Sequence, residues 1–175
     1  MGALARIDSA HVDAVEVSPH RARLIEKTVS DLPVDVHVVD GRDPGVGEGF
    51  DRVLVDAPCS GLGALRRRPE ARWRKSESDI DELNQLQFEL LSSALNLVRP
   101  GGLVIYSTCS PDLRETRAIV DRALSELGST ELDAHALIPD MGDVGREKSV
   151  QMWPHRHGTD AMFFAALRRG KGQTR

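Results

Sequence analysis

Cysteine is scarce in this sequence, which has two thiols in 175 residues. So few thiols cannot build the disulfide framework of a small secreted domain, and they favour a reducing compartment. Cys59 and Cys109 lack the close spacing of a paired-cysteine zinc motif, and His155 with His157 has no third ligand nearby. We therefore expect neither disulfides nor a bound metal.

Long apolar runs and an excess of positive charge are also missing. No stretch approaches the roughly 20 apolar residues that cross a bilayer, and "MGALARIDSAHVD" has no signal-peptide core. We expect a cytoplasmic protein with no membrane partner. The net charge of −4 means that any contact with nucleic acid must come from local basic patches.

Alternating apolar and polar residues predict a succession of strands and helices. Strands are expected at 12–17, 34–40, 50–56 and 103–109, with weaker ones at 129–137 and 160–167. Helices are expected at 19–32, 76–98 and 112–127, and "GVGEG" at 45–49 reads as a turn. This order predicts one α/β domain with a mostly parallel sheet, covered on both faces, whose ligands bind at the carboxyl ends of the strands.

Five chemically active residues stand at or near these strand ends: Glu16, Asp40, Asp56, Cys59 and Cys109. A strand-end acid can accept hydrogen bonds from a ribose, although it can equally cap the following loop. A thiol before a helix N-terminus has a lowered pKa, although many cysteines are simply buried. Two thiols at one edge of a sheet suggest covalent attack followed by release.

Three collinear blocks carry a family resemblance: "DAPCSGLGALRRRPEARWRKSESDIDELNQLQFELL", "VRPGGLVIYSTCS" and "WPHRHGTDAMFFAAL". They resemble the signature blocks of the Sun/RsmB-type RNA cytosine-5 methyltransferases, and the similarity runs from about residue 12 to 168. The resemblance implies a Rossmann-like fold that uses S-adenosylmethionine. It also implies methylation of cytosine carbon 5 in ribosomal or transfer RNA through a covalent cysteine adduct.

The same resemblance assigns roles to the strand-end residues. It makes Cys109 the nucleophile that adds to carbon 6 of the base, and gives Cys59 the release of the adduct. For S-adenosylmethionine it implies Glu16 at the ribose, Asp40 near the adenine and Asp56 near the methionine end or the cytosine edge.

A basic cluster follows the Pro-Cys motif directly. Arg66, Arg67 and Arg68 stand where they could hold RNA phosphates while the target base is turned out, and Trp73 could stack on a base. The alternatives are a solvated run of charge and a tryptophan that covers the next helix.

The chain departs from the family pattern at its start, because no strand and glycine-rich cofactor loop precede Val12. The family's N-terminal RNA-binding domain is not seen either. We expect an N-terminally truncated arrangement with a remnant at 1–11, a partial methyltransferase domain at 12–168 and a basic tail at 169–175. Two alternatives remain, a catalytically silent RNA-binding remnant and a methyltransferase acting on small molecules or proteins; the latter needs no paired thiols.

Overall fold

The structure is a computed structural model that describes residues 10–69 and 77–170. Trp73 and the basic residues at 72–75 lie outside the described residues. The chain divides into two compact units, residues 1–47 and 48–175, and each is described here by itself.

The first unit is a strand–helix–strand unit. It contains β1 (Val12–Val15), α1 (Pro19–Thr28) and β2 (Val34–His37), and the two strands pair in parallel. Both strands and the helix end a few residues before the sequence predicts. Ser18 caps α1 by accepting a hydrogen bond from the amide of Arg21, and Pro19 occupies the first turn, where no amide is needed.

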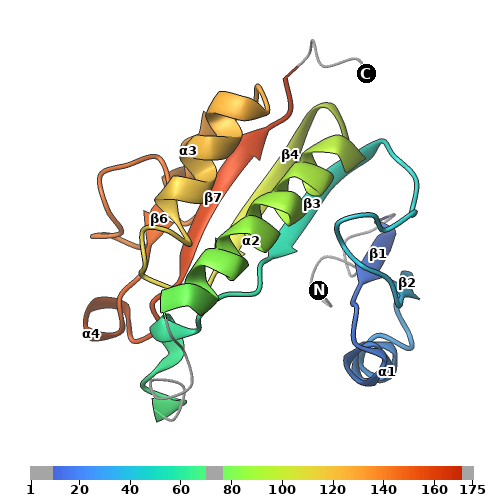
Figure 1. The fold of residues 1–175 in the computed structure, drawn as a ribbon, viewed down its shortest axis with the longest axis horizontal. Helices are drawn as coiled ribbons and strands as arrows, with labels where there is room; N and C mark the ends of the chain where they lie inside the picture. Colours follow the sequence, from blue (N-terminus) through green and yellow to red (C-terminus); the bar gives the residue numbers. More distant parts are fainter. Residues whose placement is uncertain (1–9, 70–76, 171–175) are drawn as a thin grey trace. The chain divides into compact units, whose positions relative to one another are not determined.

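The second unit holds a five-stranded sheet and two long helices (Figure 1). Its elements are β3 (Phe50–Asp56), η1 (Leu62–Ala64), α2 (Glu77–Leu97), β4 (Val98–Thr108), α3 (Arg117–Glu126), β5 (Thr130–Leu132), η3 (Ala134–Leu137), β6 (Val150–Gln151), α4 (Pro154–His157) and β7 (Phe163–Arg168). The strand order is β3-β4-β7-β5, with β6 paired to β7.

The sheet is mixed, so the prediction of a mostly parallel sheet is wrong. β3 and β4 are parallel, as expected from the crossover helix α2, whereas β7 runs antiparallel to β4, β5 and β6. After β4, helix α3 leads to β5, which lies two positions from β4 in the sheet. The position between β4 and β5 is filled later by β7. Between β5 and β7 the helices η3 and α4 are only four residues long each, whereas a parallel return needs a longer crossover. The chain therefore returns antiparallel in β7.

The two faces of this sheet are covered differently. Buried residues of α2 and α3 pack on one face against the side chains of Val104, Tyr106 and Phe163. On the other face the buried residues come from η3, from the loop segment at Val144 and from strand β6 at Val150, where the sequence predicted helical cover. Within the described part of the chain, no helix is both long enough and apolar enough to cross a membrane.

Helix α3 begins at Arg117, five residues later than the predicted helix at 112–127. The preceding residues form turns because their side chains bind the local backbone. The amide of Asp112 donates to Ser110 Oγ (3.1 Å), and the amide of Arg114 donates to the Asp112 carboxylate (2.9 Å). Cys109 therefore does not lie at a helix N-terminus, and the expected lowering of its pKa by a helix dipole is wrong.

Leu91 of α2 is fully buried in the core beneath the sheet. Replacing it with alanine leaves a cavity, and we expect the Leu91→Ala variant to lose about 2–5 kcal/mol of unfolding free energy in urea denaturation. Leu113→Ala is the matched control because that side chain is 72% exposed. Equal losses in the two variants would contradict the packing described for α2.

Candidate active site

The parallel pairing of β3 and β4 brings the two cysteines together. Asp56 lies opposite Ser107 in the register, so the residues that follow each strand leave the sheet at the same edge. Cys59 Sγ and Cys109 Sγ are 3.1 Å apart, and both side chains are partly buried. The prediction that the two thiols meet at one edge of the sheet is confirmed by this distance.

The two thiols differ in acidity. The hydrogen bond from Cys59 lowers the pKa of Cys109 from an ordinary 9.0 to about 7, although burial and the negative charges of Asp56 and Asp160 oppose the shift. The hydrogen bond to Cys109 raises the pKa of Cys59 above its ordinary range, and burial adds to the effect. Cys109 is therefore the more acidic thiol of the pair, which suits Cys59 as the donor in their hydrogen bond.

The loop that carries Cys59 is held by a buried carboxylate, Glu115. The Ser60 amide donates to Glu115 Oε1 (2.7 Å), and the Ser60 hydroxyl donates to Oε2. Gln87 of α2 donates to Glu115 Oε1 (3.1 Å) and to the carbonyl of Pro58 (2.8 Å). Glu115 has no exposed surface, and these hydrogen bonds offset the free-energy cost of removing its carboxylate from water.

A close backbone contact fixes the other side of the loop. The Gly63 amide donates to the Cys109 carbonyl (2.9 Å), and the Ala161 amide donates to the Gly63 carbonyl (2.9 Å). A Cβ atom at Gly63 would lie 2.2 Å from the Ala161 carbonyl oxygen, so only glycine fits here. The loops after β3 and β4 and the segment before β7 are thereby joined around the thiols.

The three arginines after this loop do not share one environment. Arg67 forms an ion pair with the buried carboxylate of Asp160 through Nε (3.0 Å to each oxygen) and Nη2. Arg66 donates to the Gly158 carbonyl (3.3 Å), and Arg68 is exposed. All three side chains are exposed, and the described contacts give Arg67 a carboxylate partner and Arg66 a backbone carbonyl.

The predicted cofactor residues fall in both units. Asp56 is exposed at the end of β3, close enough for its charge to oppose ionisation of Cys109. Glu16 and Asp40 belong to the first unit. Glu16 Oε1 accepts from the Ser18 amide (2.8 Å) and pairs with Arg21 (3.1 Å), while hydrogen bonds from Arg42 lower the pKa of Asp40 to about 2.

Sequence reasoning did not assign the supporting residues Glu115, Gln87 and Asp160 to the site. One signal was available for Gln87, which stands on the apolar face of α2, four residues after Leu83. A polar side chain on a buried face needs a partner there. The sequence carries no comparable signal for the pairing of Asp160 with Arg67, which are 93 residues apart.

Comparison with known proteins agrees with this geometry. The family model "16S rRNA methyltransferase RsmB/F" matches residues 2–168. The chain belongs to the RsmB/F family of RNA methyltransferases, which use S-adenosylmethionine. The resemblance found in the sequence is thereby confirmed.

The sequence of this RsmB/F chain is also similar to those of individual curated proteins. It is 57% identical to "Putative methyltransferase Rv1407" of Mycobacterium tuberculosis over 92% of its own length. It is 36% identical to "Ribosomal RNA small subunit methyltransferase B" of Cronobacter sakazakii over 90% of its length. The chain spans only 35% and 36% of these two relatives.

Solved structures show the same fold. The crystal structure of NSun6 from Pyrococcus horikoshii with SFG superposes with a TM-score of 0.80, at 27% identity, covering 91% of this chain and 41% of that one. The structure titled PH0851 gives a TM-score of 0.81 at 33% identity, covering 90% of this chain and 37% of that one. The expectation of a methyltransferase-like α/β fold is therefore confirmed.

The acidity of Cys109 is testable by alkylation. A lowered pKa means more thiolate at a given pH, so iodoacetamide should react with Cys109 along a pH curve whose midpoint lies near 7. In Cys59→Ala the donor is lost, and the midpoint should move up toward 9. The rate is followed by mass spectrometry of the peptide that contains Cys109. An unchanged midpoint in Cys59→Ala would show that another group sets this pKa.

The role of Glu115 is testable by an isosteric change. Glu115→Gln puts an amide group among three donors, so we expect a loss of about 1–3 kcal/mol in unfolding free energy and slower alkylation of Cys109 at pH 8. Glu82→Gln, at an exposed position of α2, is the matched control for removal of one negative charge. A variant as stable and as reactive as the control would refute the supporting role of Glu115.

Proposed function

We propose that this chain carries the catalytic thiols of an RNA cytosine-5 methyltransferase that acts on ribosomal or transfer RNA. The observation that supports the proposal is the pair of sulfur atoms 3.1 Å apart, in which the pKa of Cys109 is lowered and that of Cys59 is raised. Methylation of a small molecule or a protein at a ready nucleophile does not require such a pair.

The proposed first step uses Cys109. Its thiolate adds to carbon 6 of the cytosine, and the electron pair of the carbon 5–carbon 6 double bond moves into the ring, where nitrogen 3 takes a proton. Asp56, exposed at the end of β3, stands close enough to Cys109 to favour that protonation. Carbon 5 is then an enamine carbon and can accept a methyl group.

Release then falls to Cys59. Once Cys109 is bonded to carbon 6, its negative charge is gone and it no longer accepts the hydrogen bond from Cys59. Those two influences are among the causes that raise the pKa of Cys59, so their loss lowers this pKa and lets the thiol pass its proton to solvent. The Cys59 thiolate then takes the proton from carbon 5, and the electron pair of that bond forms the carbon 5–carbon 6 double bond. The carbon 6–sulfur bond breaks, Cys109 leaves as a thiolate, and nitrogen 3 loses its proton to solvent.

The residues proposed for S-adenosylmethionine fit a ligand with hydroxyl and amino donors. Glu16 accepts hydrogen bonds, and among the described contacts they reach Oε1 alone, so Oε2 suits a ribose hydroxyl. Both carboxylate oxygens of Asp40 accept hydrogen bonds from Arg42. An amino group of the adenine would therefore bind Asp40 alongside Arg42. Asp56 is proposed for the methionine end. When bound, S-adenosylmethionine supplies the methyl group.

Two of the three arginines expected to bind RNA are proposed here as phosphate contacts. These are Arg66 and Arg68, because Arg67 is bound to Asp160. The proposed substrate contacts therefore lie beside the loop that carries Cys59, within the same unit.

A second candidate is an RNA-binding remnant without catalysis. It is favoured by the ion pairs that already occupy the two acids, Glu16 with Arg21 and Asp40 with Arg42. Titration calorimetry of the 175-residue chain with S-adenosylmethionine separates the two. Saturable binding would exclude the remnant, and absence of heat would exclude independent activity.

The cysteine roles are tested by trapping the adduct. With S-adenosylmethionine and ribosomal RNA present, Cys59→Ala should accumulate a covalent RNA complex that survives denaturing electrophoresis, because attack proceeds and release does not. The double variant Cys59→Ala/Cys109→Ala should form none. A complex that persists in the double variant would refute the assignment of Cys109.

A further inference from the structure

A cluster of two histidines and two aspartates, to which no role has been given above, lies in the first unit. His11 and Asp13 alternate along β1 and the residue before it, and Asp35 and His37 alternate along β2. Asp13 and Asp35 are register partners, so all four side chains point from one face of the two-stranded sheet. The opposite face carries apolar residues such as Ala14, which is buried.

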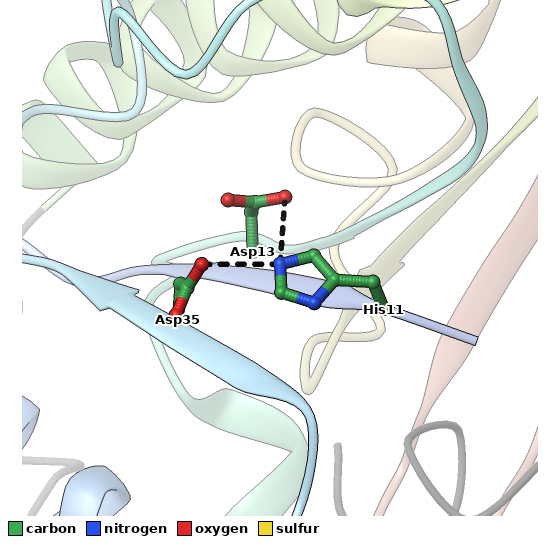
Figure 2. A group of neighbouring side chains, drawn as sticks. All are labelled: His11, Asp13 and Asp35. Atoms are coloured by element: carbon green, nitrogen blue, oxygen red, sulfur yellow. Dashed lines mark hydrogen bonds and ion pairs between the residues drawn. The ribbon is translucent and has the colours of Figure 1, made fainter. Parts of the chain in front are cut away.

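The contacts within this cluster form a chain of donors and acceptors. His11 Nε2 lies 3.1 Å from Asp35 Oδ2 and 4.0 Å from Asp13 Oδ2. Figure 2 shows this ring nitrogen facing both carboxylates. The other oxygen of Asp13, Oδ1, lies 2.7 Å from His37 Nε2. His11 thus stands between two carboxylates, and His37 fixes the orientation of Asp13.

The spacing suits a small transition-metal ion. An ion with tetrahedral ligands at about 2.1 Å keeps its ligand atoms about 3.4 Å apart. The separations of 3.1 and 4.0 Å bracket that value, and one ligand atom from each of His11, Asp13 and Asp35 lies within 4.8 Å of the others. Small side-chain rotations would therefore complete three ligand positions and leave the fourth for water.

The charges also favour a cation at this place. Asp13 and Asp35 are directly opposite each other on neighbouring strands, an arrangement in which like charges destabilise a sheet. Asp13 is largely withdrawn from solvent, with 18% of its side chain exposed, so water screens the repulsion poorly. A neutral imidazole can donate Nε2–H to one of the two carboxylates at a time, whereas a divalent ion binds both.

We propose that His11, Asp13 and Asp35 form a binding site for a divalent transition-metal ion of the Zn²⁺ type, with His37 as the residue that orients Asp13. Imidazole nitrogen in the ligand set favours such ions over Mg²⁺ and Ca²⁺, which prefer oxygen ligands alone. None of these residues belongs to the cysteines or to the pair His155 and His157, whose spacing in the sequence argues against a metal site. Glu16 directly follows β1, so a bound ion would stiffen the strand that leads to this proposed cofactor contact.

Zinc titration of the full chain tests the proposal. Since paired thiols bind Zn²⁺ themselves, the titration uses the variant Cys59→Ser/Cys109→Ser as background. Calorimetry should give one equivalent of Zn²⁺ and a raised unfolding temperature, while Mg²⁺ at the same concentration should give neither.

Substitutions locate the ion. Asp35→Asn and His11→Ala, both at exposed side chains, should weaken Zn²⁺ binding by about tenfold or more, and His37→Ala by about tenfold. His20→Ala, at an exposed histidine of α1, is the matched control and should bind as the background does. Circular dichroism of each variant confirms that it is folded. Lack of saturable binding, or equal affinity in His20→Ala and Asp35→Asn, would overturn the proposal and leave the cluster as ion pairs only.

Discussion

The buried carboxylate of Glu115 is the constraint on which the active-site geometry depends. It follows β4 in the chain, yet it binds the loop after β3 through Ser60 and the helix α2 through Gln87. The hydroxyl of Tyr106 donates to its backbone carbonyl (2.8 Å), so the turn before α3 is tied to the core of the sheet as well. A charge without exposed surface has few acceptable positions, and that restriction fixes the loop that carries Cys59.

The unequal acidity of the two thiols follows from that fixed loop. A single S–H donor can lower the pKa of its neighbour only when the two sulfurs are held in contact, because the effect falls off steeply with distance and angle. Glu115 positions one thiol through Ser60, and the backbone clamp at Gly63 positions the other through the Cys109 carbonyl. The acid–base difference thus arises from backbone and carboxylate contacts, and no helix dipole is required.

Much of this was predictable from local patterns, and the failures have definite physical causes. The carboxyl ends of β3 and β4 were predicted to within one residue, and parallel pairing then places Cys59 beside Cys109. The direction of β7 was not predictable from its apolar residues, which would suit either orientation. The start of α3 was misplaced because side chains such as Ser110 and Asp112 bind the backbone locally and compete with the helix, which periodicity alone does not reveal. Glu16 and Asp40 were predicted as cofactor residues and stay a proposal.

The basic cluster after the Cys59 loop takes on a second role when the charges near Cys109 are considered together. Asp56 and Asp160 both disfavour a thiolate at Cys109. Arg67 pairs with Asp160, and its own pKa is raised by that carboxylate and by the charge on Cys109. Arg67 makes the direct ion pair with Asp160, and the charges of Arg66 and Arg68 also act on that carboxylate. Arg67 therefore helps to offset a charge that disfavours a thiolate at Cys109 and anchors the loop, while its side chain stays exposed like those of Arg66 and Arg68.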